Sequence, residues 1–242
     1  MKKLILILFI ASMPFVLSFA TEQETATTQT CQELAAIIAK QHEFPVVKQQ
    51  IGDITDSRLL RRSKRYSSDG RRVSLRKGGL TDNVTYITVA QLPPLPVSDS
   101  DVIARVLITN FQPYFSQDES KIWTDFEVQV REIFYSAPGL VLRAGDIIKV
   151  ERSGGAILTS EGITYRERIS DRGMPRIGEE HIIFLVRDAK ISSFGSPDLI
   201  ILTSYLIRNM EVFPIDSENA ISFELAGTDL EQFVMKLREV LK

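Results

Sequence analysis

The chain has 242 residues, of which 44% are hydrophobic and 25% are charged, and these proportions are ordinary for a globular protein. Its length suits one sizeable domain with an appendage, or two small domains. A single cysteine, Cys31, excludes an internal disulfide, and a formal net charge of −2 points to neither a strongly basic nor a strongly acidic protein.

The first 20 residues have the pattern of a secretory signal peptide. Two lysines open the segment, an apolar stretch covers residues 4–17, and Ser18 and Ala20 supply small side chains before a cut ahead of Thr21. A membrane anchor is the competing interpretation, but Pro14 interrupts the stretch, which is shorter than the roughly 20 residues that span a bilayer. We therefore expect a periplasmic or secreted protein with no transmembrane span after cleavage.

Residues 21–96 are expected to form an arm ahead of the main domain. Thr30 and Glu33 resemble a capping box, which predicts a short helix near residues 30–41 with Cys31 on its apolar face. The lone thiol either packs as a small apolar residue or links two chains. Three prolines within residues 92–97 indicate an extended linker, because proline cannot donate a backbone hydrogen bond.

The arm carries a strongly basic segment between Arg58 and Lys77, with nine basic side chains and one acidic one. Because like charges repel, and serine and glycine loosen the backbone, we expect an extended segment. Two interpretations stay open. The segment either contacts an anionic surface, such as membrane headgroups, envelope polymer or the protein's own acidic body, or it is a solvated arm with no dedicated partner. The candidate contact residues are Arg58, Arg61, Arg62, Lys64, Arg65, Arg71, Arg72, Arg76 and Lys77.

From residue 97 to 226 the sequence predicts a β domain. In the clearest strand, residues 122–134, Phe126 and Val128 share one face while Asp125 and Glu127 share the other. Further strands are expected at residues 102–108, 147–152, 181–187 and 199–207, and a hairpin is expected at residues 156–169. The fold class is therefore mainly β with flanking helices, a small barrel or sandwich.

A C-terminal amphipathic helix is expected over residues 227–242. Thr228 and Glu231 form a capping box at its start. Its apolar stripe needs a surface to cover, so we expect the helix to pack on the β domain and close it. The stripe consists of Leu230, Phe233, Val234, Leu237 and Leu241.

Residues 92–187 resemble a family of uncharacterised exported bacterial proteins. The resemblance lies in the segments Leu92–Pro96, Trp123–Val128, Leu142–Asp146, Arg152–Gly155 and Gly173–Gly178. These are turn and core residues, so the resemblance implies an architecture, a small OB-like β-barrel, and an exported compartment. The family carries no established activity, and no site residue is transferred from it.

The sequence shows no recognisable catalytic, metal or cofactor site. Neither His42 nor His181 has a second ligand at a zinc-binding spacing, and the Gly-x-Ser-x-Gly motif of many hydrolases is missing. Gly154 and Gly155 open no helix, as a phosphate loop would. We therefore expect no cofactor and a non-catalytic binding or interaction module of the cell envelope. A hydrolase with an unrecognised site and a purely structural subunit are the alternatives.

Trp123, the sole tryptophan, is the candidate ligand contact. By alternation it shares the polar strand face with Asp125 and Glu127, and small barrels bind extended polymers by stacking on exposed aromatics. Alternatively, Trp123 is covered by the C-terminal helix or the N-terminal arm. The partner classes left open are an anionic envelope polymer, a membrane surface and a protein, whereas nucleic acid is not expected for an exported chain.

Overall fold

The computed structural model describes residues 45–48, 57–66, 71–77, 80–86, 92–170, 172–188, 198–216 and 222–242. The predicted signal peptide, the helix predicted near residues 30–41 and Cys31 lie outside these residues.

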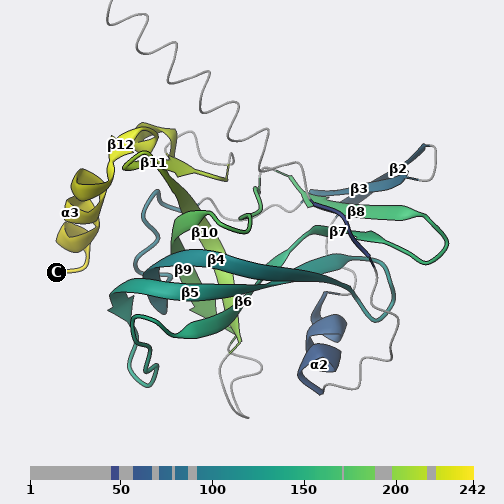
Figure 1. Cartoon of the computed structure of the whole chain (residues 1–242), viewed down its shortest axis with the longest axis horizontal. Coiled ribbons are helices and arrows are strands. Elements are labelled where there is room, and N and C mark those ends of the chain that lie inside the picture. The colour runs from purple at the N-terminus through teal and green to yellow at the C-terminus, as the bar shows by residue number, and fades with distance from the viewer. Residues whose placement is uncertain are drawn as a thin grey trace, which may run out of the picture.

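The described chain is mainly β, with two sheets and a C-terminal helix (Figure 1). The larger sheet contains β4 (Val102–Phe115), β5 (Ile122–Ser136), β6 (Ile147–Ser153), β9 (Glu180–Arg187), β10 (Leu199–Arg208), β11 (Glu211–Pro214) and β12 (Thr228–Asp229). The smaller sheet contains β1 (Val47–Lys48), β2 (Arg71–Lys77), β3 (Leu80–Tyr86), β7 (Gly155–Leu158) and β8 (Thr164–Ile169). The helices are α2 (Ser57–Arg65), the short 3-10 helix η1 (Ser222–Leu225) and α3 (Leu230–Val240).

Five strands of the larger sheet form a ring. Its order is β10, β6, β5, β4 and β9, and β9 pairs back with β10. All contacts are antiparallel except the one between β6 and β10, which has only two register pairs, Leu199 with Val150 and Ile200 with Glu151. The ring is therefore partial at that contact. Five strands in this order make a small OB-like barrel, as expected.

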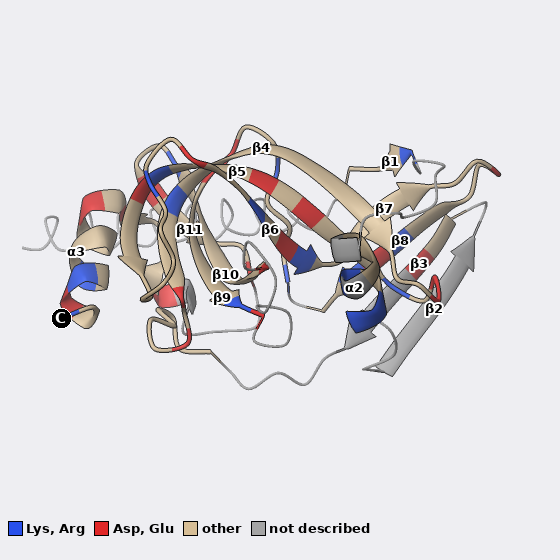
Figure 2. Ribbon diagram, turned by 90° about the horizontal axis from the view of Figure 1, so that it is seen from below, with Lys and Arg blue, Asp and Glu red and all other residues tan. Residues whose placement is uncertain are grey.

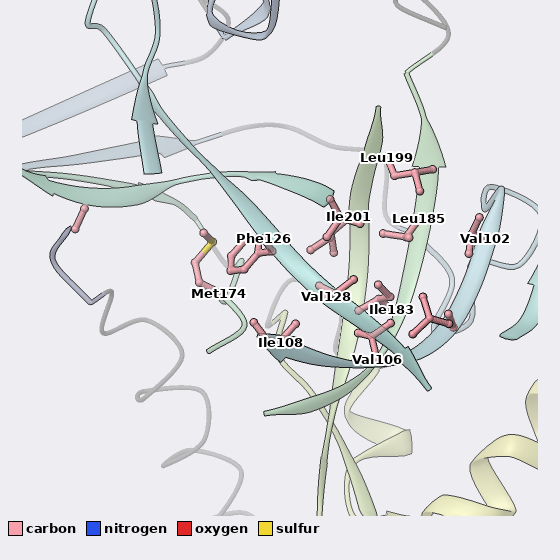
Figure 3. Close-up of a cluster of buried hydrophobic side chains, with 14 residues drawn as sticks. Val102, Val106, Ile108, Phe126, Val128, Met174, Ile183, Leu185, Leu199 and Ile201 are labelled. Carbon is pink, nitrogen blue, oxygen red and sulfur yellow. The ribbon is translucent and has the colours of Figure 1, made fainter. Parts of the chain in front are cut away.

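The interior of the ring is an apolar cluster, to which each strand contributes alternate residues. Phe126, Val128 and Val130 of β5 are at most 1% exposed, which confirms the predicted inward face of this strand. In Figure 3 the Met174 side chain lies against Phe126, which places the connection before β9 over this end of the cluster. The core thus holds β5 and β6 rigidly, together with the polar residues on their outer face.

The predicted C-terminal helix is present as α3, at the end of the molecule opposite the smaller sheet (Figure 1). Its residues Leu230, Phe233 and Leu237 are buried in a second apolar cluster with Ile103 and Tyr205. The predicted stripe is confirmed because these side chains recur on one helix face, where they meet the outer surface of the ring.

The cap of α3 differs from the expected one. The Asp229 carboxylate accepts the backbone N–H groups of Glu231 at 2.9 Å and Gln232 at 3.2 Å. Thr228 and Asp229 both belong to the short strand β12, where they pair with Val212 and Glu211. The helix therefore starts one residue later than the capping box predicted.

The basic segment is not extended throughout, and that prediction is wrong. Its first part is the helix α2, and its second part, β2, pairs with β3 as an antiparallel hairpin at the edge of the smaller sheet. Self-repulsion does not unfold α2, because acidic side chains of the ring neutralise two of its arginines.

Candidate functional site

The outer face of the ring is buried where β5 begins and β6 ends. Trp123 and Asp125 of β5 and Glu151 of β6 are at most 7% exposed, although alternation places them away from the core. Helix α2 covers them, and the Gln117 N–H of the β4–β5 connection donates to the Ser63 carbonyl at 3.2 Å. In Figure 2 the basic α2 lies beside the end of β6, next to the acidic positions of β5.

Arg62 is the centre of this contact. It is 1% exposed, and its Nη1 donates to both carboxylate oxygens of Asp125 at 2.6 Å. Nη2 donates to Asp198 Oδ1 at 2.6 Å, and Nε lies 3.0 Å from Glu151 Oε2. All three guanidinium nitrogens thus face carboxylates, which come from β5, β6 and the residue before β10.

The register of the ring brings these carboxylates together. Asp125 and Glu151 are direct cross-strand partners, an arrangement that destabilises a sheet unless a cation lies between the two charges. Asp188 and Asp198 stand at the two ends of the β9–β10 connection, where the Asp188 N–H donates to the Asp198 carbonyl at 2.9 Å. We call Asp125, Glu151, Asp188 and Asp198 the acidic cluster.

Arg65 and Tyr66 extend the contact along one helix face, because residues three and four positions after Arg62 lie on the same side. Arg65 Nη1 lies 2.9 Å from Glu151 Oε1 and also pairs with Asp188. The Tyr66 hydroxyl donates to Glu151 Oε1 at 3.1 Å. Glu151 is therefore contacted by three side chains, two from α2 and one from Tyr66, the residue that follows the helix.

Four carboxylates meet on this face, and Arg62 and Arg65 bind them. Burial raises the pKa of Glu151 to about 7; the charges of Arg65 and Arg62 lower it less than burial raises it, and Asp125 raises it further. Burial acts to lower the pKa of Arg62, but the hydrogen bond to Asp198 and the carboxylate charges outweigh burial, so this pKa is raised. The cluster therefore strongly favours a bound cation.

The exposed aromatic platform predicted at Trp123 is not present, because this side chain is fully buried. The indole is stacked between Tyr66, at 5.3 Å between ring centres and 5° between planes, and Tyr114, at 5.5 Å and 24°. In the structure Trp123 is covered by the N-terminal arm, which was the alternative interpretation. Tyr66 follows α2 directly, so the same segment covers the aromatic and the acidic parts of the face.

The nine basic candidates divide into three groups. Arg62 and Arg65 bind the acidic cluster, so for them the protein's own acidic body is the anionic surface. Lys64 is exposed on α2. The side chains of Arg58, Arg61, Arg71, Arg72, Arg76 and Lys77 lie outside the described residues, although their backbone belongs to α2 and β2.

A Ser–His–Glu array lies between β9 and β10. The Ser204 hydroxyl is 3.3 Å from His181 Nδ1, and His181 Nε2 is 3.3 Å from Glu179 Oε2. Ser204 and His181 are fully buried, so no substrate reaches the hydroxyl without opening the strand pair. Within the described residues, no group of three or more histidine, cysteine or acidic side chains is arranged to hold a metal ion.

Sequence reasoning found Arg62, Arg65 and Trp123 as candidates but missed the acidic cluster. The available signal was the helical spacing of Arg62, Arg65 and Tyr66, together with Asp125 on the strand face of Trp123. Glu151 and Asp198 gave no local signal, because their role depends on strand pairing between distant segments.

Comparisons of the chain with family models, with curated proteins and with solved structures find no match. None of the helices in the described ranges has the length and apolar character needed to cross a bilayer.

Proposed function

We propose that this protein is a non-catalytic binding module of the cell envelope, which binds cationic protein segments on the outer face of β5 and β6. The observation that carries the proposal is the convergence of Asp125, Glu151 and Asp198 on one buried guanidinium. A planar cation with several donors satisfies such a set of carboxylates better than a point charge does.

The position of the face supports the proposal by analogy of fold. OB-like barrels bind ligands across the second and third strands of the ring and the loops that join strands one to two and four to five. Here those strands are β5 and β6. The first of the two loops is the β4–β5 connection, which carries Gln117, and the second is the β9–β10 connection, which runs between Asp188 and Asp198. Because a fold does not determine a function, the ligand class rests on the carboxylates.

Charge separates the partner classes. Carboxylates repel phosphate groups, which disfavours nucleic acid and anionic lipid on this face and favours a protein segment that carries arginine. An anionic envelope polymer or membrane surface would need the basic residues of the edge strand β2 (Arg71–Lys77) instead. The envelope location rests on the signal-peptide pattern of residues 1–20 and on the resemblance to exported bacterial proteins.

The hydrolase alternative gains no support from the described residues. Ser204 and His181 are sealed between β9 and β10, and the cluster on the outer face lacks an accessible nucleophile because arginines cover it.

Calorimetric titration of the full chain with hexa-arginine tests the proposal. The Arg62→Ala variant opens the face, so we expect it to bind hexa-arginine but not hexa-glutamate. Adding Asp125→Asn and Asp198→Asn should weaken binding at least tenfold, because each removes a charged acceptor. The matched control adds Glu132→Gln, which changes an exposed acid that pairs with Arg238, and should leave affinity unchanged.

Failure of a folded Arg62→Ala chain to bind hexa-arginine would refute the proposal, as would equal affinity with and without Asp125 and Asp198. Binding of the wild-type chain to phosphatidylglycerol vesicles, with no peptide binding by any variant, would move the function to the basic strand β2.

A further inference from the structure

We infer that α2 is a tethered ligand of the β5–β6 face, which an arginine-bearing segment of a partner protein displaces. This inference rests on the proposed function and adds the recognition pattern and the way in which the site is closed.

The contact between α2 and the ring is polar, as an exchangeable contact should be. Among the α2 side chains that the structure describes, Arg62 and Ser63 are buried, whereas Leu60 is 39% exposed. None of these described α2 side chains belongs to the apolar clusters of the ring. A buried ion pair gains little net free energy, because desolvation of the charges offsets most of their attraction. A second arginine with the same geometry can therefore compete with Arg62.

The length of α2 also favours exchange. Nine residues are too few for a stable isolated helix in water, so docking and helix formation depend on each other. A competing segment meets the same folding cost as α2 does, and neither has the advantage of a preformed helix.

An empty face is unfavourable, which explains why the chain supplies its own occupant. Without Arg62 the directly opposed Asp125 and Glu151 would repel each other across the sheet. The face must then take up another cation or protons. Exchange of α2 for a partner segment keeps the carboxylates neutralised throughout.

The contacts define what the partner segment must carry. Arg62 donates hydrogen bonds from Nη1 and Nη2 and has Nε close to Glu151, Arg65 bridges Glu151 and Asp188, and Tyr66 stacks on Trp123. The pattern is arginine, two further residues, arginine and an aromatic residue within one helical turn. Lysine cannot replace the first arginine, because a single ammonium group cannot reach three separated carboxylates.

The test uses a fluorescein-labelled peptide with the sequence of Ser57–Tyr66 and the full chain, with fluorescence anisotropy as the readout. We expect Arg62→Ala to bind this peptide at least tenfold more tightly than the wild type, because the tethered α2 competes at a high effective concentration. A peptide with lysine at the two positions equivalent to Arg62 and Arg65 should bind at least tenfold more weakly. Arg238→Ala, which removes an exposed arginine from α3, should behave as the wild type.

Release of α2 is followed with a nitroxide on Lys64→Cys in a Cys31→Ser background. Lys64 is exposed on α2, and we expect the label to become mobile when the peptide saturates the chain. If Arg62→Ala does not fold, Arg65→Ala, which alters a partly exposed residue, serves in its place.

Three results would overturn the inference. Equal peptide affinity of the wild type and Arg62→Ala would show that α2 does not compete, and a label that stays immobile at saturation would show that the peptide binds elsewhere. Concentration-dependent dimers with exchanged α2 helices would assign the face to a second copy of the chain. In the first two cases the hexa-arginine titration of the Asp125 and Asp198 variants still decides the proposed function, whereas absence of peptide binding to every folded variant refutes the proposed function itself.

Discussion

Arg62 is a cation without access to water, so its energy depends on its carboxylate partners. The three carboxylates offset the cost of desolvating the guanidinium, and the guanidinium offsets the repulsion between Asp125 and Glu151. Removal of Arg62 leaves buried negative charges uncompensated. This loss is much larger than the net gain that the intact set provides.

We expect Arg62→Ala to lower the free energy of unfolding by about 3–5 kcal/mol, the usual cost of breaking a buried ion pair from one side. Arg238→Ala removes the same side chain from an exposed pair with Glu132, 62% and 43% exposed, and should cost less than about 1 kcal/mol. Urea denaturation at pH 7.5 measures both variants. Similar values for the two would contradict the burial of Arg62 among carboxylates.

Glu151 makes stability depend on pH in an unusual direction. Its pKa is about 7 in the folded chain, above the ordinary glutamate value, because burial outweighs Arg62 and Arg65. A raised pKa contributes stability that is complete below the unfolded value, near 4.5, and is lost as the pH rises through about 7.

We therefore expect the Glu151 contribution to increase stability as the pH falls from 8 to 5, by about 1.4 kcal/mol for each unit of pKa shift. Thermal unfolding of the wild type and of Glu151→Gln between pH 8 and 5 isolates the contribution of Glu151, because glutamine does not titrate. As the pH falls from 8 to 5, the free energy of unfolding of the wild type should rise by this amount relative to that of Glu151→Gln. No change in this difference between pH 8 and 5 would mean that the arginines hold Glu151 ionised, because its folded and unfolded pKa values would then both lie below this range.

The sequence predicted the positions of single residues correctly where the pattern lies within one strand. Alternation along β5 placed Trp123 and Asp125 together on the polar face, and they are together. What covers that face was not predictable, because Arg62, which binds Asp125, is 63 positions away in the sequence. The charge run from Arg58 to Lys77 was judged by its own repulsion, without the carboxylates that neutralise it.

At the scale of elements, α3 and α2 show which contacts a sequence reveals. α3 packs through an apolar stripe with helical spacing, and that pattern is readable without knowing the partner surface. α2 packs through charges, whose effect changes sign with the neighbour they meet. The helix boundary of α3 was missed by one residue, because Thr228 and Asp229 are both suitable caps in sequence, and it is the Asp229 carboxylate that accepts the backbone N–H groups of Glu231 and Gln232.

Substitutions at the start of α3 distinguish these two caps. Asp229→Ala should lower the free energy of unfolding by about 1 kcal/mol, because the backbone N–H groups of Glu231 and Gln232 lose their acceptor. Thr228→Ala should cost clearly less. Thermal denaturation of the two variants gives the order, and a larger loss for Thr228→Ala would assign the cap to the threonine.

At the scale of the whole molecule, the sequence predicted the strands of the ring and the hairpin of β7 and β8, but not the smaller sheet to which that hairpin belongs. Alternating residues between 102 and 207 predicted the strands of the ring, and the resemblance implied their small-barrel arrangement. The smaller sheet pairs β3 in parallel with β8, which lies about 80 residues further along the chain. Such a pairing leaves no local pattern, so neither the assembly of this sheet nor the docking of α2 on the ring followed from the sequence.

Acrylamide quenching of Trp123 tests most directly whether α2 covers the β5–β6 face. Trp123 is the sole tryptophan, so its emission reports this face alone. We expect the wild type to be quenched several-fold less than free N-acetyltryptophanamide, and Arg62→Ala to be quenched more than the wild type while Arg238→Ala is not. Quenching of wild-type Trp123 as strong as that of the free amide, or no change in a folded Arg62→Ala chain, would contradict the docking of α2 on the ring.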